Sequence, residues 1–201
     1  MVMKKIVVGI SGASGAIYAV RLLAALAACP VHVYLIVSDT GAELLKMETG
    51  IEAPGLEAWL SQNTAFHKEA RISVCGIGDF YTPPASGSFL HDGMVIVPCS
   101  MKSVAAVASG MADNLMLRCA DVCLKERRRL ILVPRETPLS LVHLENMAAV
   151  TRAGAVVLPA MPSFYFKPKT IEALADTVCA RILDQLGIAH TLVPRWGEDH
   201  V

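Results

Sequence analysis

The stretch KKIVVGISGASGAIYAVRLL, from Lys4 to Leu23, decides the fold of this chain. It begins with a short apolar run typical of a buried strand, passes through Gly9, Gly12 and Gly15, and ends in the apolar spacing of a helix. A glycine-rich turn between strand and helix commonly binds a phosphate, because bare backbone N–H groups and a helix N-terminus attract anions. We therefore expect a strand, a phosphate-binding turn and a helix here.

The rest of the chain repeats this alternation. Apolar runs predict strands at 4–10, 31–37, 93–98, 129–134 and 154–160, with a shorter candidate at 72–75. Helical patterns occupy 14–28, 39–49, 56–62, two segments between 102 and 128, 139–153 and 170–186. Continuous apolar strands separated by helices are what a parallel sheet covered on both faces requires. Residues 1–201 are therefore expected to form one α/β domain, with a doubly wound, mostly parallel sheet and helices on both faces.

The composition of the chain indicates which kinds of binding partner to expect. The chain has 201 residues, 54% hydrophobic and 18% charged, which is more apolar than a small monomer needs and predicts a homo-oligomer. The formal net charge is zero, which argues against nucleic acid or an anionic membrane surface as the main partner. No run of about 18 apolar residues occurs, so we expect no membrane span.

The six cysteines indicate free thiols rather than a disulfide framework or a metal site. They are scattered among apolar neighbours without a CxxC pair, and no histidine completes a metal set around Cys119 and Cys123. Buried thiols are typical of a reducing compartment, so a cytoplasmic location and no bound metal are expected.

The expected ligand site lies beyond the carboxyl ends of the strands, as in other doubly wound sheets. Hydroxyl, carboxylate and cationic side chains follow several strands, including Ser38, Asp39, Ser100, Lys102 and Arg135. A separate irregular stretch, 75–93, carries glycine, proline and aromatic residues. Loops of this length in a compact domain are often functional, so we interpret it as a site loop, with a surface excursion as the alternative.

The glycine pattern favours a mononucleotide over other phosphates. GxxGxxG departs from the dinucleotide fingerprint at its second glycine, and neither a GxxxxGK[ST] loop nor a GxSxG elbow is present. Asp39 stands where a ribose-binding acid is expected, but it is equally interpreted as a helix N-cap. The phosphate of FMN fits this truncated fingerprint better than a dinucleotide does.

An ordered set of motifs then resembles the UbiX family of flavin prenyltransferases over nearly the whole chain. The set comprises GISGASGAIY (9–18), PPASGS (83–88), PCSMKS (98–103), RCADVCLKERR (118–128), LVPRETPL (132–139), HLENM (143–147), SFYFKP (163–168) and PRWGE (194–198). The resemblance implies a flavodoxin-like or Rossmann-like fold that binds reduced FMN and attaches a dimethylallyl group to N5 and C6. It also implies a dimethylallyl phosphate donor, no metal, sites between the subunits of a large homo-oligomer, and delivery of prenylated FMN to a UbiD-type decarboxylase.

The resemblance also assigns residues by motif position. The residues assigned to FMN binding are Gly12, Ala13, Ser14, Ser38, Ser100, Met101, Lys102, Ser103 and Arg135. The donor phosphate is assigned to Arg118, Lys125, Arg135, Tyr165 and Arg181, and proton handling to Ser14, Glu48 and Glu136. Phe80 stands where some members carry a tryptophan against the donor. Cations stabilise a leaving phosphate, and a carboxylate within reach can move the flavin proton, so these residue types suit the chemistry.

Plainer readings and two rival functions stay open. Lys125 can complement a helix dipole, Arg181 can be a surface residue on an apolar helix, and Tyr165 can be a core aromatic. One rival function is an FMN-dependent cysteine-type decarboxylase, for which His67 is the candidate histidine. The other is a non-catalytic flavin carrier, which leaves the second set of phosphate-binding residues unexplained.

Overall fold

The computed structural model describes residues 3–195 and 197 and shows alternating strands and helices along the chain. Its strands are β1 (Lys4–Ile10), β2 (Val31–Val37), β3 (Arg71–Cys75), β4 (Gly93–Cys99), β5 (Leu130–Pro134) and β6 (Val156–Val157). Its helices are α1 (Ala16–Ala27), α2 (Asp39–Thr49), α3 (Leu56–Asn63), α4 (Met101–Ala108), α5 (Leu115–Lys125), α6 (Leu141–Ala153) and α7 (Ile171–Leu186).

The six strands form one sheet in the order β3-β2-β1-β4-β5-β6, and every neighbouring pair is parallel. This is the strand order of a Rossmann-type doubly wound sheet, and it confirms the expected fold class. The strand order reverses between β1 and β4. At such a switch point the connections leave in opposite directions, which opens a crevice beyond the carboxyl ends of the two strands.

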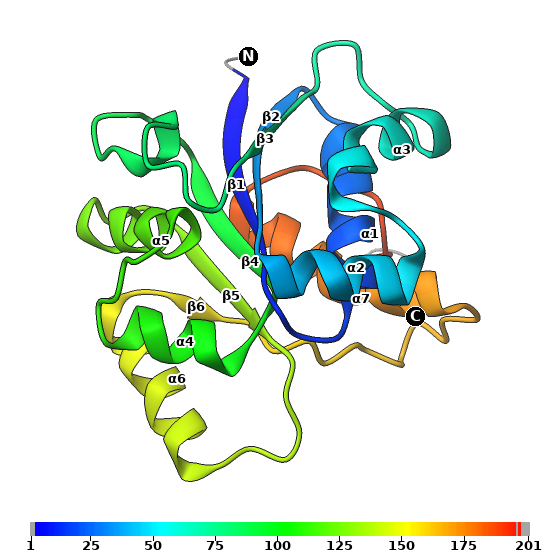
Figure 1. The fold of residues 1–201 in the computed structure, drawn as a ribbon. Helices are drawn as coiled ribbons and strands as arrows, with labels where there is room; N and C mark the ends of the chain where they lie inside the picture. Colours follow the sequence, from blue (N-terminus) through cyan, green and yellow to red (C-terminus); the bar gives the residue numbers. More distant parts are fainter. Residues whose placement is uncertain (1–2, 196, 198–201) are drawn as a thin grey trace.

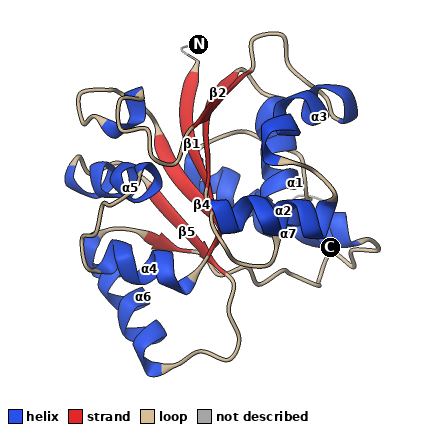
Figure 2. Ribbon diagram, in the orientation of Figure 1, coloured by secondary structure: helices blue, strands red, loops and turns tan. Residues whose placement is uncertain are grey.

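Helices cover both faces of the sheet, as Figures 1 and 2 show. Side chains of β1 alternate between two apolar layers, because successive residues of a strand point to opposite faces. Ile6, Val8 and Ile10 pack with α1, α2, α3 and α7, whereas Val7 packs on the side of α4, α5 and α6. The sheet is therefore buried on both faces, which explains its nearly uninterrupted apolar strands.

Two element boundaries differ from the sequence expectation for local backbone reasons. Helix α1 begins at Ala16 rather than at residue 14, because Gly15 has a φ of 115° and cannot belong to the helix. The last strand pairs only at Val156–Val157, whereas a run from 154 to 160 was expected. Gly154 has left-handed geometry as the cap of α6, so the strand begins after it. Beyond Val157 the chain still runs beside β5, because the N–H groups of Leu158 and Ala160 donate to the carbonyl oxygens of Leu132 and Pro134.

The structure also bears on the expected site loop, the free cysteines, the membrane span and the metal site. Residues 76–92 are irregular apart from a short 3-10 turn at Pro83–Ala85, and 71–75 does form a sixth strand. All six cysteines are free. No described helix is both long and apolar enough to cross a membrane. Within the described residues, no group of three or more potential ligands could hold a metal ion. Trp196 and Glu198 of the closing motif lie outside the described residues.

Candidate functional site

A cavity of about 750 Å³ lies at the switch point of the sheet, and we call it the first cavity. Its volume is within the range of sites that bind small molecules and cofactors. The segments that follow β1, β2 and β4 supply most of its polar wall, and α4 and α5 supply its apolar wall. Lining residues are Ser11, Gly12, Ser38, Asp39, Thr40, Ile77, Ser100, Lys102, Ser103, Ala105, Ala106, Ser109, Met111, Asp113, Asn114, Met116 and Leu117.

Helix caps fix the hydroxyls of the first cavity. Ser38 accepts a 3.1 Å hydrogen bond from the N–H of Gly41, and Ser100 accepts one of 3.2 Å from the N–H of Ser103. These bonds place the N-termini of α2 and α4 at the cavity wall, where helix dipoles favour an anion. Among the described residues that line this cavity, Lys102 alone carries a positive charge.

The structure also corrects the reading of Asp39 and refines that of Gly12. Asp39 is the first residue of α2, and its neighbour Ser38 is the cap, so the N-cap interpretation of Asp39 is wrong. A Cβ atom at Gly12 would stand 2.7 Å from Cγ2 of Thr40, which is closer than real contacts allow. Gly12 is therefore required for the approach of the first turn to α2, whether or not a ligand is bound.

Three of the predicted residues are joined at the same end of the sheet, and we call Ser14, Glu48 and Arg135 the edge cluster. The Glu48 carboxylate accepts hydrogen bonds from the N–H groups of Gly15, at 2.9 Å, and Ala16, at 2.8 Å. Arg135 donates from Nε to the carbonyl oxygen of Ser14 at 3.1 Å. These bonds connect the first turn to α2 and to the segment after β5.

The environment of Glu48 keeps its carboxyl group ionised. Partial burial raises the pKa of Glu48, but hydrogen bonds from Gly15, Ser14 and Ala16, together with the charge of Arg135, lower it by more. The net pKa lies below the ordinary value for glutamate. The start of α1, where a helix dipole favours negative charge, is thus occupied by the carboxylate of Glu48.

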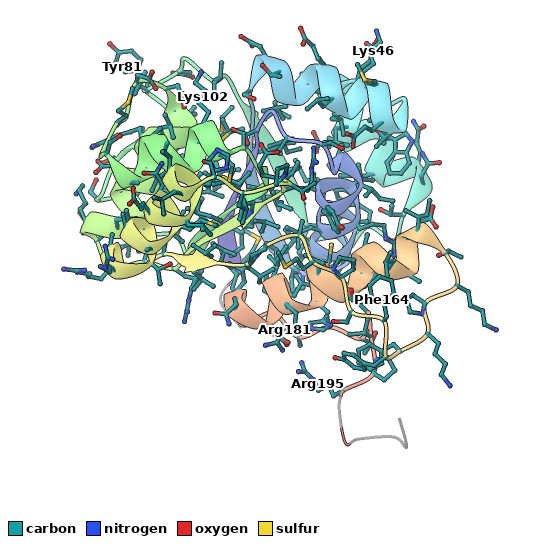
Figure 3. All side chains as sticks on the ribbon, turned by 90° about the horizontal axis from the view of Figure 1, so that it is seen from below. Lys46, Tyr81, Lys102, Phe164, Arg181 and Arg195 are labelled. Carbon is teal, nitrogen blue, oxygen red and sulfur yellow. The ribbon has the colours of Figure 1, made fainter. Side chains whose placement is uncertain are left out.

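Tyr165 and Arg181 lie elsewhere, in a second cavity of about 270 Å³ on the outer side of α7. Ser163, Phe166, Thr177, Ala180, Asp184, His190, Val193, Pro194 and Arg195 complete its lining. Figure 3 shows Arg181 and Arg195 at one corner of the molecule, well away from Lys102 in the first cavity. Arg181 is 64% exposed at its side chain and pairs with Asp184 at 3.0 Å, which agrees with the reading of it as a surface residue on an apolar helix.

Arg118, Lys125 and Phe80 occupy a third location, around α5 and the loop 76–92. Arg118 donates to the carbonyl oxygen of Ala85 at 3.0 Å and pairs with Asp121 at 2.8 Å. Lys125 pairs with Glu126 at the end of α5. Phe80 is partly exposed on the loop. None of these three residues lines the first or the second cavity.

The residues assigned to the donor phosphate therefore do not converge within one chain. Parallel strands explain why, since each connecting helix must return to the edge where the strands begin. Lys4, at the start of β1, binds the carbonyl oxygens of Leu186 and Gly187, so the end of α7 lies at that edge. Lys125 ends α5 five residues before β5 begins and lies at the same edge.

The remaining residues that the resemblance assigned lie outside both cavities. Met101 is buried in the apolar layer on the side of α4, Ala13 is buried in the first turn, and neither lines a cavity. Glu136 is exposed just after β5, and its carboxylate accepts a 3.0 Å hydrogen bond from the N–H of Thr137. No ion pair joins Glu136 to Arg135 in the part of the chain that the structure describes.

Sequence reasoning missed several residues of the two cavities. Asn114 caps α5 by accepting a 3.0 Å hydrogen bond from the N–H of Leu117, and an asparagine before an apolar helical run is a recognisable start signal. Ser11 donates to the carbonyl oxygen of Pro98 and accepts from the N–H of Ser100, which ties the turns after β1 and β4 together. In the second cavity, His190 carries no such local signal, and Arg195 lies in the PRWGE motif without an assigned role.

Fold and cavity together define a doubly wound α/β protein with a small-molecule site at its switch point. A family model described as Flavoprotein matches residues 1–192. The flavin prenyltransferase UbiX of Methanothermobacter thermautotrophicus is 47% identical over 199 residues, covering 98% of both chains. The chain therefore belongs to the Flavoprotein family and, within it, to the UbiX-type flavin prenyltransferases.

Two solved structures resemble the whole chain. The first, AnUbiX (PadA1) in complex with FMN and dimethylallyl pyrophosphate, has a TM-score of 0.88 and 44% identity, covering 97% of this chain and 98% of that one. The second is a dodecameric FMN-dependent Ubix-like decarboxylase from Escherichia coli O157:H7. It has a TM-score of 0.86 and 42% identity, covering 96% of this chain and 98% of that one.

Proposed function

We propose that this protein transfers a dimethylallyl group from dimethylallyl phosphate to N5 and C6 of reduced FMN, giving prenylated FMN for a UbiD-type decarboxylase. The observation that carries the proposal is the edge cluster. Ser14, Glu48 and Arg135, which the family resemblance assigns to flavin and proton handling, are joined by hydrogen bonds two residues from Gly12 in the cavity wall. The full-length similarity to flavin prenyltransferases supports it.

The first cavity is the proposed FMN site. Its serine hydroxyls and the starts of α2 and α4 suit a phosphate, and Lys102 supplies the positive charge. Met116 and Leu117 offer apolar surface for a flavin ring. Asp39 is negatively charged, so it suits the hydroxyl groups of the ribityl chain rather than the phosphate.

The chain's own residues would handle charge and protons while bound FMN supplies an electron-rich nucleophile. The donor's carbon–oxygen bond breaks with its electron pair on phosphate, and new bonds form to N5 and C6. Protons leave N5 and C6; one goes to the allylic double bond and the other to the phosphate. Glu48 and Glu136 are the proposed proton carriers, and arginine and lysine donors stabilise the departing phosphate.

The separated donor-binding residues indicate a site shared between copies of the chain. The edge cluster, the second cavity and the Arg118–Lys125 segment of α5 are in different places on one subunit, and each presents charged groups outward. A neighbouring copy can place its Arg181 and Tyr165, or its Arg118 and Lys125, against the edge cluster. A large homo-oligomer would then be needed for activity.

Hybrid oligomers test both the activity and the shared site. Glu136→Gln and Arg181→Ala variants are prepared separately, mixed under conditions that exchange subunits, and incubated without oxygen with reduced FMN and dimethylallyl phosphate. If Glu136 and Arg181 of one site come from different chains, random mixing leaves about a quarter of the sites with both native residues. Mass spectrometry should therefore show recovered prenylated FMN in the mixture. Activity of the native protein without recovery in exchanged oligomers would place both residues in one chain's site.

The decarboxylase rival is the second candidate, because the Escherichia coli relative is described as an FMN-dependent decarboxylase. Its candidate histidine, His67, follows α3, and its N–H binds the carbonyl oxygen of Ala27. His67 lines neither cavity. The same incubation separates the candidates, since a decarboxylase or a flavin carrier leaves the mass of FMN unchanged. The cytoplasmic location stays a prediction.

A further inference from the structure

One carboxylate in the second cavity gathers three cationic or potentially cationic side chains. Asp184, near the end of α7, accepts from Nη1 of Arg181 at 3.0 Å through Oδ2. Its Oδ1 accepts from Nη2 of Arg195 at 2.9 Å and lies 3.2 Å from Nε2 of His190. The partners come from α7 and from the segment after it, so Asp184 brings two guanidinium groups from different parts of the chain into one cavity (Figure 3).

Asp184 and His190 are the enclosed members of this cluster, whereas the Arg181 and Arg195 side chains are 64% and 49% exposed. The Asp184 side chain is 21% exposed, and the His190 ring is 6% exposed with no hydrogen-bond partner for Nδ1 among the described residues. Burial raises the pKa of Asp184, but hydrogen bonds from Arg195 and His190 lower it by more, so the carboxylate is ionised at neutral pH. An ionised, partly buried carboxylate shared by two arginines can orient both guanidinium groups, even where the pair adds little to stability.

The net positive charge of the cluster favours binding of an anion. Two guanidinium groups against one carboxylate give one net positive charge with His190 neutral. Each guanidinium has five N–H donors and uses one of them on Asp184 in the bonds above, so donors remain on both. Tyr165 lines the same cavity. Planar guanidinium groups bind phosphate oxygens in pairs, which makes a phosphate the fitting ligand.

We propose that Asp184 is a positioning residue that orients Arg181 and Arg195 as a pair, and that Arg195 is a further ligand for the donor phosphate. The inference rests on the proposed function, because the phosphate is that of the allylic donor. The competing explanation is purely structural: the Asp184 contacts tie the segment around His190 and Arg195 to α7. The two explanations predict different effects on phosphate binding.

The test compares Arg195→Ala, Arg195→Lys and Asp184→Asn with the native protein and with a matched control. The control is Gln185→Ala, because Gln185 is the next residue of α7 but accepts a hydrogen bond from Arg129 outside the second cavity. For each FMN-loaded protein we would measure the Kd of inorganic pyrophosphate by calorimetry, KM and kcat for dimethylallyl phosphate, the oligomer size and the melting temperature.

Arg195→Ala should raise the pyrophosphate Kd and the donor KM by about ten- to a hundredfold, with FMN binding unchanged. Arg195→Lys should recover part of this, since it keeps the charge but loses the planar fork. Asp184→Asn is the sharpest variant. It adds net positive charge, so simple electrostatics predicts tighter pyrophosphate binding, whereas loss of positioning predicts weaker binding. Gln185→Ala should behave like the native protein.

Two results would overturn the inference. One is an Arg195→Ala protein that only melts earlier, with pyrophosphate Kd and donor KM as in the native protein. The other is tighter pyrophosphate binding by Asp184→Asn. Failure of the proposed function gives a different result, because the native protein would then form no prenylated FMN while pyrophosphate binding could still be measured and compared across the variants.

Discussion

The carboxylate of Glu48, on α2, accepts a 2.9 Å hydrogen bond from the N–H of Gly15, the residue that precedes α1. This bond and its companion to Ala16 satisfy donors at the start of α1 that have no partner within the helix. Glu48 is therefore both a structural cap and an acid that is hydrogen-bonded to Ser14. A reaction that protonates Glu48 weakens the cap, which links the protonation state of the site to the position of the first turn.

Glu48→Gln should lower the free energy of unfolding by about 1 kcal/mol at neutral pH, because an ionised group at a helix N-terminus is lost. The pKa of Glu48 is lowered in the folded protein, so its stabilisation is present above about pH 4.5 and is lost as the pH falls through the lowered pKa. The difference between native and variant proteins should shrink in acid. Urea titrations at several pH values measure it. Glu52→Gln, which removes an exposed pair with Lys46, is the control and should cost less.

Gly12→Ala should weaken FMN binding through Thr40 rather than through direct contact with the ligand alone. The added Cβ would stand 2.8 Å from Cβ of Thr40, so the first turn of α2 must shift at the wall of the first cavity. Fluorescence titration with FMN should show a loss of tenfold or more, an order-of-magnitude expectation for a disturbed site. Adding Thr40→Gly should restore part of the affinity, although that change alone costs about 1 kcal/mol in the helix. No recovery in the double variant would mean that the ligand itself occupies this space.

The fold was predictable because its signals are local. Apolar runs long enough for a buried strand specified β1, β2, β4 and β5, and caps such as Ser38 and Ser100 specified where helices begin. The exception was β6, an edge strand whose regular pairing covers only Val156 and Val157, because Gly154 still belongs to the cap of α6. Apolar character alone does not report how many ladder hydrogen bonds a strand can make.

The site was predictable only in part, because it depends on where helices end as well as on which residues they carry. Residues that follow strands, such as Ser38, Ser100 and Lys102, reached one cavity as expected. Lys125 ends α5 at the opposite edge of the sheet and Arg181 lies on the outside of α7, and no local pattern relates either to the edge cluster. The contact between Asp184 and Arg195 depends on the course of the chain after α7, which carries no periodic signal.

Arg118 and Arg128 allow loop anchoring to be separated from phosphate binding. Both donate to carbonyl oxygens of the loop 76–92: Arg118 to Ala85, and Arg128 to Phe89 at 2.7 Å and to Gly87. Arg128→Ala should therefore increase proteolysis within the loop but change donor KM less than threefold, as expected for a residue without ligand contact. Arg118→Ala should loosen the loop and also raise donor KM about tenfold or more. Limited proteolysis and steady-state kinetics measure the two effects. Equal kinetic effects of the two variants would reduce Arg118 to a loop anchor.

Tyr165 and Arg181 give the most direct test of the donor-binding role of the second cavity. Arg181→Ala and Tyr165→Phe should each weaken the use of dimethylallyl phosphate while FMN binding and oligomer size stay unchanged. Loss of a charge-assisted hydrogen bond costs about 1.5–3 kcal/mol, or roughly ten- to over a hundredfold in apparent donor affinity. The double variant should lose less than the sum of the single losses, because both side chains would bind one phosphate.

The structure sharpens this expectation for Arg181, whose guanidinium is exposed and pairs with Asp184 three residues along α7. An exposed pair of this kind contributes little to stability, about 0–1 kcal/mol, so Arg181→Ala should hardly change the melting temperature. Donor KM and thermal unfolding of the same variant are therefore measured together. A large fall in melting temperature with native donor kinetics would show that Arg181 supports the fold, and that the phosphate site is not in the second cavity.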